Sequence, residues 1–254
     1  MSLAGRAGKP GEGAIERGGN PGRWPARGLG ALLLVSGLGA FAPALAHGIA
    51  GKDAAFVAAS HGAQIVPFAY LGAKHMLTGY DHLLFLAGVV FFLYELRHVA
   101  LYVTMFSLGH SATLLLGVLT NLRVDPYLVD AVIGLSVAYK AFDNLGGFRT
   151  VFGVQPNTRL AVLGFGLVHG FGLATKLQAL RLSREGLLAN MISFNLGVEI
   201  GQLLALSAIL GLIVLWRRRP GFVRQATLAN AMILCAGFAL MEFQLAGFFA
   251  QGRT

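Results

Sequence analysis

Long apolar stretches separated by short polar connectors make up most of the chain. After a polar N-terminal region, six of these stretches are long enough to cross about 30 Å of hydrocarbon as helices that rise about 1.5 Å per residue. They cover residues 68–93, 99–119, 127–145, 160–180, 187–215 and 226–250. Runs such as LLFLAGVVFFL are apolar on every face and lack the alternation of barrel strands. The pattern therefore predicts an all-α fold, a transmembrane bundle of six helices over residues 68–250.

The N-terminal region follows a different pattern. Residues 1–28 are rich in glycine, proline and arginine, and the apolar stretch 29–46 ends in Ala44-Leu45-Ala46. A basic region, a short apolar region and an A-x-A sequence in this order are typical of a signal peptide. We therefore expect a signal peptide over residues 1–46 with cleavage after Ala46, and an uncleaved anchor is the alternative. Either outcome makes residues 47–67 an extracytoplasmic segment.

Composition and charge narrow the class of protein further. The chain is 56 % hydrophobic and 12 % charged, with a mean hydropathy of +0.67, which excludes an ordinary soluble globule. The net charge of +9 comes largely from arginines in the connectors that follow the odd-numbered spans. That asymmetry predicts a multi-pass protein of the cell inner membrane, with the mature N-terminus and the short tail 251–254 both extracytoplasmic. Nucleic acid is not an expected partner, whereas the lipid bilayer is.

Ionisable side chains inside the predicted spans are the candidates for function. Each costs several kcal/mol in lipid unless it is paired or lines a cavity, so such groups indicate a site. The segment KHMLTGYDHLLFL opens the first span with three of them, and later spans add single histidines and an acid. The candidate metal ligands are His75, Asp81, His82, His110, His169 and Glu199. Three polar neighbours, Ser111, Asn195 and Gln202, are candidates to orient these ligands.

Helical spacing suggests how the candidates are arranged. On a straight helix His75 and His82 lie about 10.5 Å apart along the axis, so one ion is not expected to bind both. We therefore expect His82 and Asp81 to contribute to a central site and His75 to lie nearer its outer mouth. His169 is surrounded by small residues that let another helix backbone come close. These residues are Gly166, Gly170 and Gly172.

The types of ligand limit the choice of metal. Imidazole and carboxylate together suit divalent transition ions such as Ni²⁺, Co²⁺ or Zn²⁺. Cys235 is the only cysteine, which excludes a thiolate cluster and an internal disulfide. Ligation requires neutral imidazole, so uptake should weaken below a histidine pKa of about 6.5. His47, which cleavage would make the first residue, and His61 are further possible ligands at an outer capture site.

Four sequence blocks together resemble the HupE/UreJ family of membrane proteins. They are HMLTGYDH, LGHSATL, GLVHGFG and FNLGVEIGQ, in that order over residues 70–205. The resemblance implies a small polytopic permease for nickel or cobalt as the transported ion, linked to the supply of hydrogenase or urease. It implies metalloenzyme maturation proteins as partners, and a homo-oligomer stays open. The family's histidine and acid positions match His75, Asp81, His82, His110, His169 and Glu199.

Two other functions compete with a permease. The first is an intramembrane zinc-dependent hydrolase, in which three histidines hold Zn²⁺, Asp81 or Glu199 acts as general base, and Ser111 helps to bind an anionic intermediate. The chain contains neither H-E-x-x-H nor G-x-S-x-G, so no catalytic residue is assigned. The second is a metal-binding or assembly partner that does not transport. We take the permease as the leading hypothesis.

Overall fold

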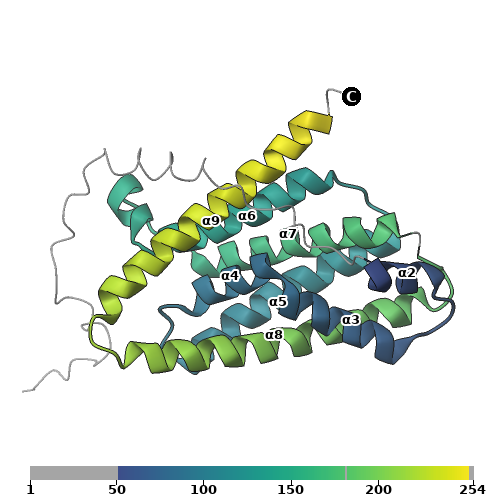
Figure 1. Ribbon diagram of the computed structural model, residues 1–254, viewed down its shortest axis with the longest axis horizontal. Coiled ribbons are helices and arrows are strands. Elements are labelled where there is room, and N and C mark those ends of the chain that lie inside the picture. Colours follow the sequence, from purple (N-terminus) through teal and green to yellow (C-terminus); the bar gives the residue numbers. More distant parts are fainter. Residues whose placement is uncertain (1–50, 181, 252–254) are drawn as a thin grey trace, which may run out of the picture.

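The computed structural model describes residues 51–180 and 182–251, and within them every regular element is a helix (Figure 1). The predicted signal peptide and His47 lie outside these residues. The helices are α2 (Gly51–Ala59), α3 (Ile65–Thr78), α4 (Tyr80–Val90), α5 (Leu96–Thr120), α6 (Pro126–Asn144), the π-helix η2 (Phe148–Phe152), α7 (Thr158–Ala179), α8 (Leu187–Arg217) and α9 (Phe222–Gln251). The all-α prediction is thus confirmed for the described part of the chain.

The first predicted span is not one straight helix. It divides at Gly79, whose φ of −69° and ψ of 91° are extended rather than helical. Glycine has a low helix propensity because its backbone loses the most freedom in a helix. The hydroxyl of Thr78 donates to the carbonyl oxygen of Lys74 at 2.8 Å, and Leu83 N–H donates to the carbonyl oxygen of Gly79 at 2.8 Å. The chain therefore enters the bundle as two short helices, α3 and α4.

The other five predicted spans correspond to single helices with bounds within four residues of those expected. Local signals explain some of these bounds. At α6 the Asp125 side chain accepts hydrogen bonds from the N–H groups of Tyr127 and Leu128, and Pro126 occupies the first helical position. The Asn157 side chain caps α7 in the same way, through Arg159 and Leu160. Asn121 ends α5 in the left-handed conformation.

Glycines allow the helices to pack closely in pairs. Between α3 and α8, a Cβ added to Gly201 would lie 2.7 Å from the carbonyl oxygen of Ala73. Between α6 and α9, a Cβ on Gly134 would lie 2.6 Å from the backbone nitrogen of Met241. Distances this short leave no room for a side chain, so these backbones touch directly. The pairs α3 with α8, α5 with α7, and α6 with α9 form the framework of the bundle.

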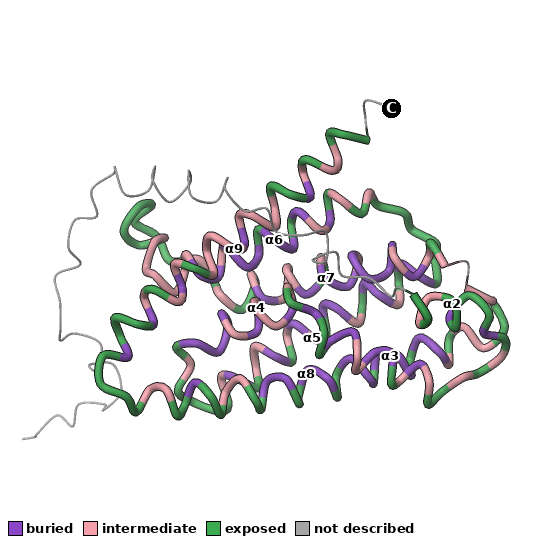
Figure 2. Tube along the Cα trace, in the orientation of Figure 1, coloured by how far each residue is buried: buried purple, intermediate pink, exposed green. Residues whose placement is uncertain are grey.

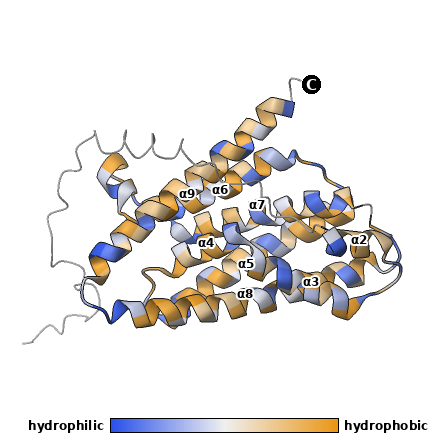
Figure 3. Cartoon of the chain, viewed as in Figure 1, coloured by the Kyte–Doolittle hydropathy of each residue, from blue (hydrophilic) through white to orange (hydrophobic). Residues whose placement is uncertain are grey.

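The outer surface of the bundle is apolar. Many large hydrophobic side chains are exposed along the helices, among them Leu108 on α5, Leu160 on α7, and Leu203 and Leu212 on α8. Figure 2 shows exposed residues along the outside of α8 and α9, and Figure 3 shows that these segments are mostly hydrophobic. Four helices, α5, α7, α8 and α9, are long and apolar enough to cross a membrane. An apolar exterior of this extent is expected of a membrane protein.

The connections alternate between the two ends of the bundle. The α4–α5, α6–α7 and α8–α9 connections lie at the same end, on the left in Figure 1. At this end the Arg217 guanidinium donates to the carbonyl oxygens of Val90 at 3.1 Å and Phe91 at 2.7 Å. It also lies 4.2 Å from the centre of the Tyr94 ring. The hydrogen bonds of Arg217 therefore connect the C-terminal end of α8 to the C-terminal end of α4.

Candidate metal site

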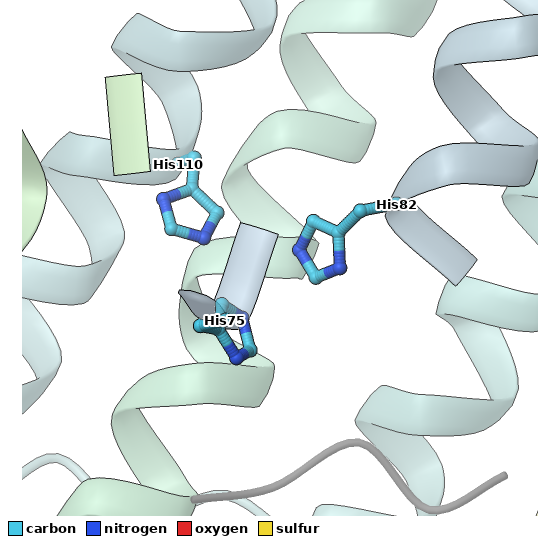
Figure 4. A group of neighbouring side chains, drawn as sticks. All are labelled: His75, His82 and His110. Carbon is cyan, nitrogen blue, oxygen red and sulfur yellow. The ribbon is translucent and has the colours of Figure 1, made fainter. Parts of the chain in front are cut away.

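Three buried histidines from three helices lie close together inside the bundle (Figure 4). His75 comes from α3, His82 from α4 and His110 from α5, and their exposed fractions are 7 %, 2 % and 1 %. One ligand nitrogen from each lies within 4.8 Å of the others. Three nitrogens at this spacing can surround one divalent ion after small side-chain adjustments, because metal–nitrogen bonds are about 2.0–2.1 Å long.

A fourth histidine, His169 of α7, lies beside this group and is 1 % exposed. Its ring centre is 5.0 Å from that of His82. The His82 ring is also 5.1 Å from the ring of His75 and 5.9 Å from the ring of His110. His82 is therefore the central ring of the cluster, and it lies within reach of each of the other three.

The break at Gly79 brings the first two histidines together. The expectation that His75 and His82 lie about 10.5 Å apart assumed a continuous helix, and for this chain that assumption is wrong because α3 ends at Thr78. The break also places His75 in the last turn of α3 and His82 in the first turn of α4. Carbonyl groups at a helix C-terminus attract cations, and Asp81 offsets the positive N-terminal end of α4.

Hydrogen bonds define the tautomers of two histidines. An Asp81 carboxylate oxygen lies 2.8 Å from Nδ1 of His82 and also accepts from the backbone N–H of His82 at 2.8 Å. A carboxylate accepts hydrogen bonds, so Nδ1 of neutral His82 carries the proton and Nε2 the lone pair. In His169, Nδ1 lies 2.8 Å from the carbonyl oxygen of Phe165, so the same reasoning gives Nε2 the lone pair. Such partners orient metal-binding imidazoles.

Buried ring nitrogens with no hydrogen-bond partner distinguish this cluster from an ordinary helix contact. Neither ring nitrogen of His110 has a partner among the described residues, and neither does Nε2 of His169. Buried polar atoms in native proteins nearly always have a partner, because leaving one unsatisfied costs free energy. A cation bound by the three-histidine group would satisfy one ring nitrogen of His110. The donor set therefore fits a metal ion better than it fits a network of hydrogen bonds.

Aromatic rings enclose the cluster. The Phe106 ring centre lies 5.1 Å from that of His169 and 6.2 Å from that of His110. Phe85 lies 5.4 Å from His169, and Phe194 lies 6.2 Å from His75. Apolar neighbours of this kind lower the local polarity, which strengthens electrostatic interactions inside a site. Sequence reasoning did not identify the phenylalanines, since nothing in an apolar span distinguishes a wall residue from one that faces lipid.

Close packing of α5 and α7 positions two of the histidines. A Cβ on Gly166 would collide with the carbonyl oxygen of Phe106, and one on Gly170 with the carbonyl oxygen of His110. The hydroxyl of Thr113 donates across the same interface to the carbonyl oxygen of Leu167 at 2.7 Å. The expectation that small residues around His169 admit another helix is thus confirmed, with α5 as that helix. Gly172 instead faces α6, where its Cβ would meet Ile133 at 2.8 Å.

The remaining sequence candidates differ in burial and in hydrogen-bond partners. Glu199 of α8 is exposed and accepts a 3.3 Å hydrogen bond from the hydroxyl of Ser107. Gln202 is buried and donates to the carbonyl oxygen of Val103 at 3.3 Å. Asn195 is 8 % exposed, and its side-chain oxygen has no partner among the described residues. Ser111 is half-buried, and His61 is exposed in the connection after α2.

Together, the fold and the site define a polytopic helical membrane protein with a buried histidine cluster. A family model described as HupE / UreJ protein matches residues 51–252. The chain therefore belongs to the HupE/UreJ family, which confirms the resemblance seen in the sequence motifs. No curated protein matches the chain, and no solved structure matches it.

Proposed function

We propose that the protein is a membrane permease for a divalent transition-metal ion, with nickel or cobalt as the transported ion. The observation that carries the proposal is the group of buried ligand nitrogens from His75, His82 and His110 within 4.8 Å of one another. Membership of the HupE/UreJ family supports it. Buried ionisable side chains within membrane helices are expensive and mark ion pathways.

The proposed topology has six crossings in the cell inner membrane. The broken pair α3 and α4 forms the first, α6 forms the third, and the four long apolar helices form the others. Arginines concentrate at the end of the bundle that carries the α4–α5, α6–α7 and α8–α9 connections. By the positive-inside rule this end is cytoplasmic, so both ends of the described chain lie outside.

The arrangement of the rings suggests how an ion moves. An ion that enters from the outer side meets His75 first and binds among His75, His82 and His110. Because the His82 ring is near both His110 and His169, it can stay bound while His169 replaces an outer ligand. Exchange of one ligand at a time avoids a fully stripped ion inside the membrane, and a site with an open position releases its ion more easily than a closed cage.

The types of ligand atom in the site determine which metal ion is expected. Imidazole nitrogens suit Ni²⁺, Co²⁺ and Zn²⁺, and family membership favours nickel or cobalt over zinc. Cys235 on α9 is outside the ligand group, so no soft thiolate ligand favours Cu⁺. The zinc-hydrolase alternative needs a carboxylate as general base. The Asp81 carboxylate is hydrogen-bonded to His82, and the Glu199 carboxylate accepts a hydrogen bond from Ser107. These hydrogen bonds make both carboxylates less available as a general base, which counts against the hydrolase.

Metal uptake by the purified protein in proteoliposomes tests the proposal. We expect saturable accumulation of Ni²⁺ or Co²⁺ in sealed vesicles, with little accumulation of Cu²⁺. Empty liposomes and vesicles that contain a His82→Ala, His110→Ala double variant are the controls. Cleavage of a lipid or peptide that depends on Zn²⁺ would favour the hydrolase instead. Stoichiometric binding without accumulation would support a metal-binding or assembly partner.

Because of the position of His169, we expect its replacement to affect metal transport much more than metal binding. His169 lies beside His82 but outside the group within 4.8 Å. We expect the His169→Ala variant to bind Ni²⁺ within about 10-fold of the wild-type affinity, as for loss of a supporting group, but to lose most of its maximal uptake rate. Calorimetry and proteoliposome uptake measure the two quantities. Equal losses of affinity and rate would place His169 among the primary ligands and contradict the proposed transfer step.

A further inference from the structure

An apolar groove runs along the outside of the bundle between α4 and α8, at the end with the arginine-rich connections. Its volume is about 540 Å³, within the range of roughly 300–1,000 Å³ that is typical of ligand sites. Ala87 of α4 and Phe91, which directly follows α4, line one side, and Leu212 and Trp216 of α8 line the other. Apart from Arg219 its lining side chains are apolar or aromatic, which suits an acyl chain better than a polar metabolite.

The mouth of the groove is basic. Arg219 belongs to its lining, and Arg218 and Arg224 are exposed beside it in sequence. No ion pair is found for these three arginines among the described residues, whereas Arg97 at the same end pairs with Glu95 at 2.9 Å. An unpaired guanidinium such as that of Arg219, in the lining of an apolar groove, complements a phosphate attached to a hydrocarbon chain.

Two aromatic rings pack against Trp216, which lines the groove. Trp216 lies 5.7 Å from Phe91 and 5.6 Å from Phe222, both edge to face. The indole N–H of Trp216 donates to the side-chain oxygen of Gln225 on α9 at 2.6 Å. A tryptophan held in this way is typical of the membrane interface, where a lipid headgroup meets its chains.

We propose that this groove binds an anionic glycerophospholipid of the cytoplasmic leaflet, with an acyl chain along Ala87, Phe91 and Leu212 and the phosphate at Arg219. Charge complementarity selects this occupant over a zwitterionic lipid, because basic pockets at the cytoplasmic end of membrane helices favour anionic headgroups. The bound lipid spans α4 and α8, the two helices that Arg217 also connects. It therefore holds in place the helix that carries His82. The inference rests on the proposed topology and not on the metal site.

Native mass spectrometry of the full-length protein, released from micelles after exchange with defined lipids, tests the proposal. We expect phosphatidylglycerol to be retained about fivefold better than phosphatidylcholine, the factor for one basic contact. The Arg219→Gln variant should lose this preference. Ala87→Phe fills the groove and should reduce retention of both lipids. Arg149→Gln removes an exposed arginine of η2 at the same end and is the matched control.

Three outcomes would overturn the proposal. Equal retention of the two lipids by the wild-type protein removes the charge argument. An effect of Arg219→Gln without any effect of Ala87→Phe places the lipid outside the groove, and equal effects of Arg149→Gln and Arg219→Gln show diffuse attraction to the basic end. If the Ala87→Phe variant does not fold, Ala87→Leu, which adds a smaller side chain to the groove, is used in its place.

Discussion

Replacing His82 by alanine is expected to abolish specific binding of Ni²⁺ or Co²⁺ and, with it, uptake. His82 is the ring that lies within 5.9 Å of the other three, measured between ring centres. Loss of an outer-shell partner alone costs about 10–100-fold in metal affinity. Loss of the central ligand should therefore exceed about 100-fold. Isothermal titration of the purified protein measures binding, and proteoliposomes measure uptake.

His98→Ala is the matched control for this variant. His98 lies on α5, as His110 does, but its ring nitrogen is 3.4 Å from a carboxylate oxygen of Glu95 at the end of the bundle. This control should bind and transport at wild-type levels. Retained binding in the His82→Ala protein, at wild-type expression and thermal stability, would contradict a metal site centred on His82.

Most helix bounds could be predicted from sequence because they depend on local features. Apolar runs set the extent of each span, and capping by Asp125 with Pro126 or by Asn157 needs only neighbouring residues. The break in the first span could not be predicted from the sequence in the same way, because many membrane helices contain a glycine without breaking. Whether the helix breaks at Gly79 also depends on how its two halves pack in the bundle, as α3 does against α8.

Much of the cluster was also indicated by sequence, since buried histidines in lipid have few structural alternatives. The arrangement of ligands was not, because it depends on the break at Gly79 and on which helices meet. Asp81 was expected as a ligand; in the structure one of its carboxylate oxygens contacts the His82 ring, and its role as a ligand stays a prediction.

Three polar residues of α8, Asn195, Glu199 and Gln202, are close on one face of the helix but differ in burial. At about 100° per residue, Glu199 is about 40° from Asn195 on one side and Gln202 is about 20° away on the other. The three side chains therefore share one face of α8, and their spacing alone favours one environment for all three. In the structure Asn195 and Gln202 are buried, but Glu199 lies at the edge and is exposed. Tertiary packing determines how α8 is rotated about its own axis, so the sequence does not show which of these side chains is exposed.

Replacing Asp81 by asparagine is expected to weaken metal binding by about 10–100-fold without changing the number of bound imidazoles. Asparagine has nearly the same shape, and its carbonyl oxygen can still accept from the His82 ring. It lacks the negative charge that raises the basicity of His82 and offsets the incoming cation. Titration with Co²⁺ measures the affinity, and X-ray absorption of the Co²⁺-loaded protein counts nitrogen and oxygen neighbours.

Glu199→Gln is the matched carboxylate control, because Glu199 lies outside the histidine group and contacts Ser107. It should leave Co²⁺ affinity unchanged. If Asp81 were a direct ligand, Asp81→Asn would change the first coordination shell as well as the affinity. If Glu199→Gln and Asp81→Asn weakened binding equally, the carboxylates would share one role and the ion would lie nearer α8. An unchanged affinity in Asp81→Asn would show that the hydrogen bond to His82 does not tune the site.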